Sequence, residues 1–526
     1  MSVVSGKFGN SLTKQFKSNV LKIALFATGL AGIVAEYVLS TLATYFLGDS
    51  VFQWTMIVSI MLFSMGLGSR ISKAFENHLL QKFIYVEFTL SILSAFAALV
   101  AYTAAAYTLY TGLIIYTFSI SIGLLIGLEI PLVIRLNEAF EELKVNVSSV
   151  MEKDYYGSLL GGVFFAFIGL PYLGLTYTPF ILGITNFLVA LLLIVVLWAS
   201  IPKWARKKLY VLSVGVGAVL LAGLVFAKPI ILHGEQRRYK DKVIYEEQSH
   251  YQRIVITQWK NDYWLYINGN QQLSSLDEQM YHEPLVHPAM QLFAQPKNVL
   301  VLGGGDGCAV REILKYPEVN EITLVDLDPA MTRLGLEHPV LQEMNQGALH
   351  HNKVKIVNDD AFHFLENTRQ YYDVVIIDLP DPKSVELGRL YSMEFYKLAA
   401  RQMRPNGVLI TQAGSPYFAT KAFRCIDRTM QASGFQTIPL HNQILTLGEW
   451  GWVLGVKTEQ ALALKERLHA MDFSGIETSW INREAMLLIT SFGKDFFLPD
   501  SDSIRINTIH DPVLYRYYLD GNWDIY

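Results

Sequence analysis

Repeated apolar stretches fill the first 230 residues and constrain the fold more than any other feature. Seven of them contain almost no charged residue, and they run over residues 21–46, 51–69, 83–106, 110–134, 157–177, 179–200 and 209–227. About 20 mostly apolar residues cross a bilayer as a helix, and the first stretch is too long for a signal peptide and lacks its cleavage site. We therefore expect a multi-pass α-helical membrane domain over residues 1–230, with about seven spans in the lipid bilayer of the cell (inner) membrane.

Basic residues flank these spans unevenly. They precede the first span and follow the second and the sixth, which places those segments in the cytoplasm by the positive-inside rule. Seven spans then place residues 228–526 outside, although Arg237 and Arg238 follow the last span. Long domains cross largely regardless of charge, so the rule alone leaves the side of the membrane open.

Two acidic residues fall inside the spans. Glu129 lies near the end of the fourth, where we expect it to reach the interface and pair with Arg135. Glu36 lies nearer the centre of the first, as either a buried hydrogen-bonding group or a cation site. The sequence GSLLGG at residues 157–162 predicts close packing between helices.

Charge and cysteine content narrow the classes of protein. The formal net charge of −4 argues against a nucleic-acid partner, which would need a basic face, and leaves a cationic ligand possible. The two cysteines, Cys308 and Cys425, cannot form a disulfide framework.

The remaining chain predicts two further folded regions and a tail. Residues 243–273 are rich in β-branched and aromatic residues with an Asn-Gly turn, so we expect a small antiparallel β subdomain over residues 240–290. Five apolar runs then alternate with helical stretches, which predicts a doubly wound, Rossmann-like parallel sheet of the methyltransferase type over residues 291–456. The aromatic extension, residues 457–526, should pack on this domain or on a dimer partner.

Acidic residues follow four successive strands of the predicted sheet. They are Asp306, Asp326, Asp328, Asp359, Asp360, Asp378 and Asp381. A single acid in this place is usually a helix cap. Because ligands bind at the carboxyl ends of parallel strands, four in succession predict an acidic binding site.

The loop after the first strand, VLVLGGGDGCAV at residues 299–310, indicates the ligand. Its G-x-G-x-G pattern has Cys308 where a dinucleotide fingerprint needs its third glycine, which disfavours a nicotinamide cofactor. Asp326 follows at about the spacing of a ribose-binding carboxylate, twenty residues on. Asp360 is placed either to bind an adenine amino group or to cap the next helix. These features favour an adenosyl sulfonium.

Three further acids of the predicted site determine its charge: Asp306, Asp378 and Asp381. They would repel the carboxylate of a methionine-bearing methyl donor, and they favour ligands with two or more ammonium groups. Decarboxylated S-adenosylmethionine and a diamine fit this charge pattern.

The chain resembles spermidine synthases, the polyamine aminopropyltransferases, over about residues 240–456. The matching segments are YQRIVI at 251, YINGNQQLSSLDEQMYHEPLVHP at 266, VLVLGGGDG at 299, LVDLD at 324, NDDAF at 358, DLPDP at 378 and GVLITQAGSP at 407. Each alone is weak, whereas together they are specific. The apolar extension resembles the membrane-attached bacterial branch of this family.

The resemblance implies a transferase that moves the aminopropyl group of decarboxylated S-adenosylmethionine to putrescine and releases methylthioadenosine. It implies that Asp378 is the general base, and that the polyamine side is formed by Tyr281, His282, Asp306, Asp378 and Asp381. It places at the donor Gln252, Gln272, Gly303, Gly305, Asp326, Asp360 and Ala361. No cofactor or metal is implied beyond the co-substrate, and a homodimer is expected.

The sequence departs from the family pattern at three places, and one of them bears on which amine is the acceptor. Asp326 stands where glutamate is more common, and Cys308 replaces a glycine. The sequence DPKSVELG replaces the usual proline- and glycine-rich gate, which leaves the choice of amine open.

Two other functions share these features. An S-adenosylmethionine-dependent methyltransferase has the same sheet and glycine loop, although Asp306 opposes its carboxylated donor. A polyamine-binding membrane sensor or transporter could use the α/β domain as a receptor only. Because decarboxylated S-adenosylmethionine is a cytosolic metabolite, we place the α/β domain in the cytoplasm, against the count of seven spans.

Overall fold

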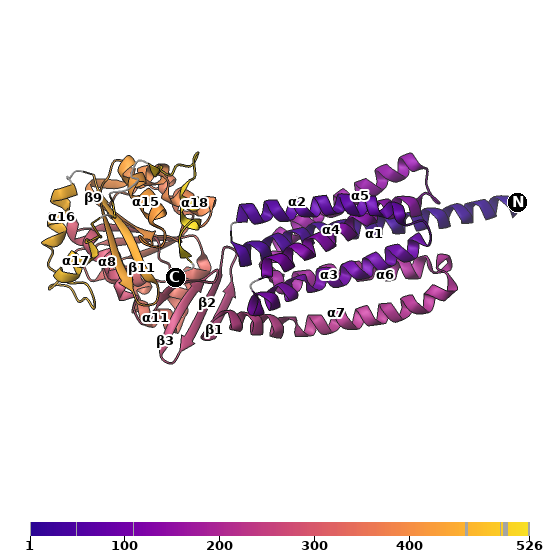
Figure 1. Cartoon of the computed structure of the whole chain (residues 1–526), viewed down its shortest axis with the longest axis horizontal. Helices are drawn as coiled ribbons and strands as arrows, with labels where there is room; N and C mark the ends of the chain where they lie inside the picture. Colours follow the sequence, from indigo (N-terminus) through magenta and orange to yellow (C-terminus); the bar gives the residue numbers. More distant parts are fainter. Residues whose placement is uncertain are drawn as a thin grey trace. The chain divides into compact units, whose positions relative to one another are not determined.

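The chain folds into two compact units, Met1–Lys240 and Asp241–Tyr526. The computed structural model describes residues 2–523 apart from 49, 109, 458–460, 495 and 498–502. In Figure 1 the first unit is helical, and the second combines helices with two sheets.

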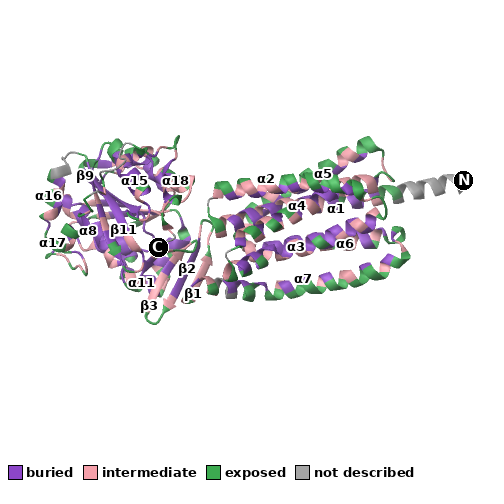
Figure 2. Cartoon of the chain, in the orientation of Figure 1, coloured by how far each residue is buried: buried purple, intermediate pink, exposed green. Residues whose placement is uncertain are grey.

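The first unit consists of long apolar helices. They are α1 (Ser2–Leu47), α2 (Ser50–Ile71), α3 (Leu79–Tyr107), α4 (Thr111–Asn137), α5 (Leu143–Phe164), α6 (Gly174–Val196) and α7 (Lys203–Arg238). In the described chain, six continuous helical segments are long and apolar enough to cross a membrane. Apolar side chains remain exposed along α7, among them Val211, Val214, Leu221 and Phe226, as a helix facing lipid requires. Figure 2 shows this exposed face of α7.

The fifth of these segments contains two of the predicted spans. It runs over 54 residues from Leu143 to Val196, enough for two crossings. A π-helix, Phe165–Leu173, separates α5 from α6, and Gly174 then adopts φ 61° and ψ −172°, which no α-helix contains. Helix α5 lies against α1, whereas α6 lies mainly against α3. The count of seven spans stays a prediction.

Close packing between α1 and α5 depends on glycine. A side-chain carbon at Gly157 would lie 2.0 Å from the backbone oxygen of Phe26, and one at Gly161 would lie 2.5 Å from that of Leu30. The prediction for the GSLLGG segment is therefore confirmed.

The predicted pair between Glu129 and Arg135 is wrong. Arg135 donates instead to the backbone oxygens of Ser72, at 2.9 Å, and Phe75. Glu129 is only 1% exposed. Six residues apart on one helix, the two side chains point in different directions, so Glu129 faces the helix bundle and does not reach the interface.

The second unit begins with a small antiparallel sheet. Its strands are β1 (Lys242–Gln248), β2 (Arg253–Trp259), β3 (Asp262–Ile267) and β4 (Asn270–Ser274), paired in chain order. Asn268 and Gly269 both have positive φ at the turn between β3 and β4, as a tight hairpin requires. The predicted β meander is confirmed.

A seven-stranded sheet follows helix α8 (Gln279–Leu292), in the order β10-β11-β9-β8-β5-β6-β7. The five predicted strands, all parallel, are β5 (Asn298–Gly303), β6 (Glu321–Asp326), β7 (Val354–Asn358), β8 (Tyr372–Asp378) and β9 (Met403–Gly414). The sheet is nevertheless mixed, because β10 (Gln436–Ile444) and β11 (Gly448–Val456) form an antiparallel hairpin beside β9.

Helices cover both faces of this sheet. The intervening helices are α9 (Cys308–Leu314), α10 (Pro329–Glu337), α11 (Pro339–Asn345), α12 (Ala361–Asn367), α13 (Val385–Gly388), α14 (Met393–Arg401) and α15 (Thr420–Ala432). Alternate residues of β5 enter separate cores: Val299 and Val301 pack with α8 and α9, whereas Leu300 and Leu302 pack with α14 and α15. The predicted doubly wound architecture is confirmed.

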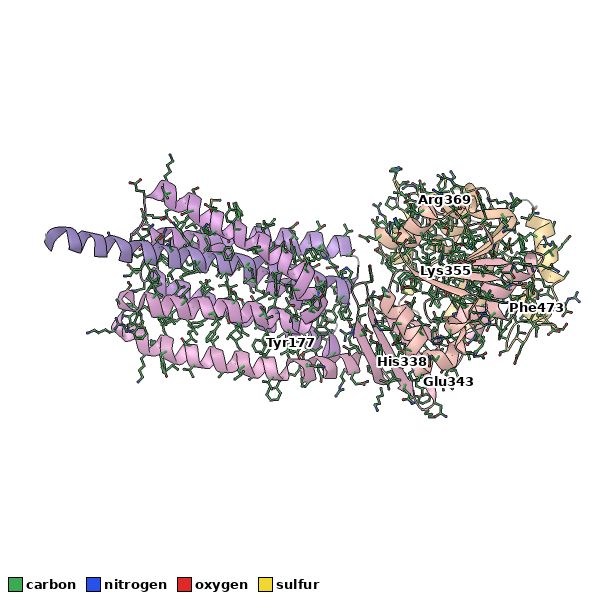
Figure 3. All side chains as sticks on the ribbon, turned by 180° about the vertical axis from the view of Figure 1, so that it is seen from behind. Tyr177, His338, Glu343, Lys355, Arg369 and Phe473 are labelled. Carbon is green, nitrogen blue, oxygen red and sulfur yellow. The ribbon has the colours of Figure 1, made fainter. Side chains whose placement is uncertain are left out.

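The C-terminal extension packs on both faces of the α/β domain. Its helices are α16 (Ala461–His469), α17 (Arg483–Ile489) and α18 (Leu514–Leu519). Leu464 and Met486 join the core under α8, and Leu514 joins the opposite core. Phe473, labelled in Figure 3, is buried beside His287 of α8. The tail therefore belongs to the α/β unit, as predicted from its aromatic residues.

Candidate active site

Glycines in the loop after β5 allow two carboxylates to approach the backbone closely. Gly303 pairs with Asp378 across the sheet and has φ 83°, and a side-chain carbon there would lie 2.0 Å from the Asp378 backbone oxygen. At Gly305 it would lie 2.6 Å from Asp326 Oδ2, which accepts the Gly305 N–H at 3.1 Å. The loop is thus shaped around the acids that end β6 and β8.

Asp378, at the end of β8, lies among other ionisable groups. Its Oδ1 accepts a hydrogen bond of 2.6 Å from the Tyr281 hydroxyl of α8. Burial raises the pKa of Asp378 to about 6; the charge of His282 and the Tyr281 hydrogen bond oppose this rise, and the charge of Asp306 adds to it. A carboxylate with this pKa is ionised at neutral pH and is basic enough to accept a proton there.

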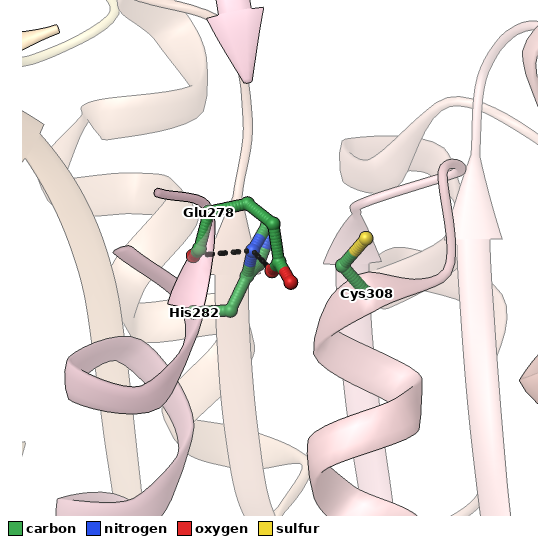
Figure 4. Close-up of side chains that lie close together, drawn as sticks. All are labelled: Glu278, His282 and Cys308. Atoms are coloured by element: carbon green, nitrogen blue, oxygen red, sulfur yellow. Dashed lines mark hydrogen bonds and ion pairs between the residues drawn. The ribbon is translucent and has the colours of Figure 1, made fainter. Parts of the chain in front are cut away.

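His282, one turn into α8, is held in a buried network of charges. Its Nδ1 lies 2.8 Å from Glu278 Oε2, as Figure 4 shows. Arg311 binds both oxygens of Glu278, at 2.7 and 3.0 Å. Burial lowers the pKa of His282, but Glu278, Asp306 and Asp378 together raise it to about 9. His282 therefore carries a proton at neutral pH.

Asp306 lies on the other side of this histidine. Its Oδ1 is 4.0 Å from His282 Nε2 and accepts the backbone N–H of Cys308 at 2.8 Å. Asp306, His282 and Asp378 thus converge, with ligand atoms within 4.8 Å of one another. Two of the three predicted acids therefore lie close to one imidazole, and their role as a binding site stays a prediction.

Two side-chain triads in this region have the composition of a metal site. They are Glu278, His282 and Cys308, drawn in Figure 4, and His282, Asp306 and Asp378. Arg311 binds both oxygens of Glu278. Burial, together with the charge of Asp306, raises the pKa of the Cys308 thiol. The ion pairs among these groups explain why the side chains gather here.

Asp381 lies in a second cluster, after β8. Its Oδ2 accepts a hydrogen bond of 2.7 Å from the Tyr518 hydroxyl of α18 and lies 3.9 Å from Lys383 Nζ. Gln412, near the end of β9, donates to Asp381 Oδ1 at 3.4 Å and to the backbone oxygen of Leu379 at 2.7 Å. The acid therefore has hydrogen-bond donors from β9 and from the C-terminal extension.

Asp326, the acid that ends β6, is surrounded by backbone N–H groups. Asp326 accepts the N–H groups of Gly305 and Asp328, and burial raises its pKa to about 6 against these bonds. Asp328 caps α10 and accepts the Ser249 hydroxyl at 2.6 Å. Ser249 also accepts the backbone N–H of Gln252, so the meander brings Gln252 to the same edge.

The remaining donor-side predictions have mixed support from geometry. Asp360 caps α12 by accepting the N–H groups of Phe362 and His363, and it forms an ion pair with Arg389. The helix-cap interpretation is confirmed, and its contact with adenine stays a prediction. Ala361 is buried at the start of the same helix. Gln272 donates to neighbouring backbone oxygens of the meander.

Several residues of these clusters were not found from the sequence. They are Glu278, Arg311, Lys383, Gln412 and Tyr518. The strand-end rule that selects Asp378 also selects Gln412, because GVLITQ at residues 407–412 is the last of the five apolar runs that predict strands. Glu278 lies one turn before His282 and was discoverable by that spacing. Nothing in the sequence connects Tyr518 with Asp381, 137 residues earlier.

The comparisons with known proteins identify the family. The model of the spermine/spermidine synthase domain matches residues 278–466. Over 505 residues the chain is 41% identical to polyamine aminopropyltransferase 2 of Aquifex aeolicus, covering 95% of this chain and 98% of that one. It is 38% identical over 514 residues to polyamine aminopropyltransferase of Oceanobacillus iheyensis, covering 96% and 98%. The chain belongs to the polyamine aminopropyltransferase family.

Structural comparison gives a weaker likeness over the second half. A crystal structure of spermidine synthase with the transition-state analogue AdoDATO is 25% identical, has a TM-score of 0.44, and covers 49% of this chain and 87% of that one. Because the sequence relatives extend over nearly the whole chain, the helical unit belongs to the family's architecture here. The protein is an aminopropyltransferase, and the methyltransferase and receptor-only alternatives are set aside.

Proposed function

We propose that this aminopropyltransferase is a spermidine synthase, which transfers the aminopropyl group of decarboxylated S-adenosylmethionine to putrescine. The observation that carries the proposal is Asp378, a partly buried carboxylate with a pKa of about 6, held by Tyr281 and placed with Asp306 about one imidazolium. This arrangement suits a reaction between two cationic substrates in which one proton must be removed.

In the proposed reaction, Asp378 takes a proton from the attacking amino group of the diamine. The freed nitrogen lone pair attacks the aminopropyl carbon bound to the sulfonium, and a carbon–nitrogen bond forms as the carbon–sulfur bond breaks. The bonding electrons pass to sulfur, and neutral methylthioadenosine leaves. A positioned base contributes roughly 10²- to 10⁴-fold to such a step.

The donor would lie along the loop after β5. Asp326 would accept hydrogen bonds from the ribose hydroxyls, with Gln252 at the same edge, and Asp360 and Ala361 would face the adenine. Gly303 and Gly305 leave room for close approach, since a side chain at either would meet Asp378 or Asp326. Asp306 would hold the ammonium of the aminopropyl group, and Gln272 would line the pocket.

The acceptor would extend from Asp378 toward Asp381. Asp381 would hold the distal ammonium of the diamine, and Tyr281 and His282 would line the side of the attacking nitrogen. A protonated His282 repels the ammonium groups of the substrates. It would therefore line the acceptor side in its neutral form, after the incoming ammonium groups have displaced its proton. Binding of the substrates and loss of this proton are then linked.

The helical unit would hold the enzyme in the lipid bilayer, with the α/β unit in the cytoplasm, where its donor is made. The six long apolar segments support the bilayer position. A cytoplasm-specific reporter fused after Tyr526 tests the side. A signal only from a periplasmic reporter would contradict the cytoplasmic placement.

The enzymatic proposal is tested with the purified full-length protein. We expect methylthioadenosine release from decarboxylated S-adenosylmethionine with putrescine, and less or none with cadaverine, agmatine or spermidine. Release with another of these amines would keep the aminopropyl transfer and overturn the choice of acceptor. Binding of the donor with no release in the presence of any of the four would overturn the proposed reaction.

A further inference from the structure

The C-terminal extension reaches into the polar cluster around Asp381. Tyr518, on α18, is 4% exposed, and its hydroxyl donates to Asp381 Oδ2 at 2.7 Å. Its ring packs on Trp523 with 4.7 Å between centroids, and the Trp523 indole donates to the Tyr518 backbone oxygen at 2.7 Å. The hydroxyl is therefore held in place from within the tail.

Lys383 competes with Tyr518 for the same carboxylate oxygen. Its ammonium lies 3.9 Å from Asp381 Oδ2, beyond hydrogen-bond distance, while it donates to Asn270 Oδ1 at 2.7 Å. The ammonium also lies 5.7 Å from the centre of the Tyr518 ring. The tyrosine hydroxyl makes the hydrogen bond to Oδ2, while the Lys383 ammonium stays at the longer distance of an ion pair.

We propose that Tyr518 is a positioning residue of the acceptor site, which orients Asp381 and keeps Lys383 from closing to hydrogen-bond distance, so that this carboxylate selects amines with a second ammonium group. The inference rests on the proposed function, because it takes Asp381 as the group that holds the distal ammonium.

The physical argument is one of competition between cations. A carboxylate has about four lone-pair positions, so donation by Tyr518 and Gln412 leaves others for a ligand. If Lys383 closed on Asp381, an intramolecular ammonium would take the place of the substrate's ammonium. A neutral hydroxyl in that position fixes the carboxylate without cancelling its charge.

The test compares acceptors that differ only in the distal amine. In Tyr518→Phe the ring and its packing stay, and only the hydroxyl is lost. We expect the KM for putrescine to rise about tenfold, the effect of losing a hydrogen bond to a charged group and admitting Lys383. We expect kcat, the KM for the donor, and kcat/KM for 1-aminobutane, which has no distal ammonium, to stay near the wild-type values.

Two further variants separate this role from tail packing. Tyr517→Phe is the matched control, because Tyr517 packs in the same helix and its hydroxyl accepts only a 3.4 Å contact from the Arg505 backbone N–H. It should leave both amines unaffected. Adding Lys383→Met to Tyr518→Phe should restore most of the putrescine affinity, because the competing ammonium is gone.

A direct measurement of putrescine binding tests the inference independently of turnover. Calorimetric titration of putrescine into protein saturated with methylthioadenosine should show about tenfold weaker binding in Tyr518→Phe, with methylthioadenosine affinity unchanged. Equal weakening for putrescine and 1-aminobutane, or no restoration by Lys383→Met, would overturn the inference even if the wild type proves fully active. Absence of turnover in the wild type, with this binding pattern intact, would overturn the proposed reaction alone.

Discussion

The two units of this protein bury carboxylates in opposite ways. In the α/β unit, Glu278 is buried with a cation on each side, Arg311 at 2.7 Å and His282 at 2.8 Å. In the helical unit, Glu87 and Glu129 are also buried. Among the described residues, neither of these two forms an ion pair with a basic group. Glu278 thus belongs to a buried network of opposite charges, whereas Glu87 and Glu129 do not.

This difference separates the buried acids that are paired with cations from those that are not. A buried ion pair costs desolvation energy, so its loss on one side leaves an uncompensated charge behind. An acid without such a partner leaves no charge behind when it is neutralised. The effects of substitution should therefore divide between the two units, and the predictions below test that division.

The largest effect on stability is expected for Glu278→Gln. It removes a carboxylate from two buried cations at once, from His282 and from Arg311, which keeps Glu312 at 2.8 Å, so the free energy of unfolding should fall by about 3–5 kcal/mol. The pKa of His282 should fall as well, because Glu278 is what chiefly raises it. Thermal unfolding of the full-length protein in detergent measures the first effect, and NMR titration of His282 measures the second. An unchanged unfolding temperature would contradict the paired-charge account.

A smaller loss is expected for Gly303→Ala. Both Gly303 and Gly347 have positive φ, but only at Gly303 does a side-chain carbon meet another atom, the Asp378 backbone oxygen at 2.0 Å. Left-handed strain of about 1–2 kcal/mol applies to both, and the clash should add roughly 1–3 kcal/mol at Gly303 only. Turnover should fall in Gly303→Ala, since Asp378 must shift. Gly347→Ala is the matched control, and equal losses of stability would refute the close-approach role.

The pH profile should follow Asp378. Burial raises its pKa to about 6, and the base acts in its ionised form, so activity is present above this pH and is lost as the pH falls through it. At saturating donor, kcat/KM for the diamine should fall about tenfold per pH unit below 6. Saturation matters because Asp326, on the donor side, has a similar pKa. A flat profile down to pH 5 would rule out Asp378 as the titrating base.

The smallest effect is expected in the helical unit. Glu87→Gln replaces a buried acid that has no basic partner among the described residues, so stability should change by less than about 1 kcal/mol or increase. Methylthioadenosine release by the full-length protein should stay at the wild-type rate. A large loss of turnover would show that the acids of the helical unit take part in the transfer. That result would contradict the expected difference between substitutions in the two units.

Local patterns in the sequence predicted most of the fold and the acids that follow the strands at the candidate site. The segment rich in β-branched and aromatic residues, the Asn268-Gly269 turn and the apolar runs of the α/β domain each depend on neighbours in the chain, and the structure confirms the strands they predict. The acids after β5 to β8 were found because the topology of a parallel sheet brings strand ends together. The antiparallel β10-β11 hairpin was missed, because its strands were not recognised among the buried runs.

The contacts that complete the site depend on distances along the chain that no local pattern covers. Arg311 reaches Glu278 over 33 residues, and Tyr518 reaches Asp381 over 137. The wrong expectation for Glu129 has the same origin: the sequence gives its depth in the span but not which neighbouring helices face it. Partners of buried charges are set by tertiary packing.

The most direct test of the central claim is the single-turnover rate of transfer in Asp378→Asn. Donor-loaded wild-type and variant protein are mixed with putrescine, and the aminopropylated product is followed by mass spectrometry. We predict a rate roughly 10²- to 10⁴-fold lower in the variant. A variant that transfers at the wild-type rate would contradict the account, since Asp378 would then not be the base.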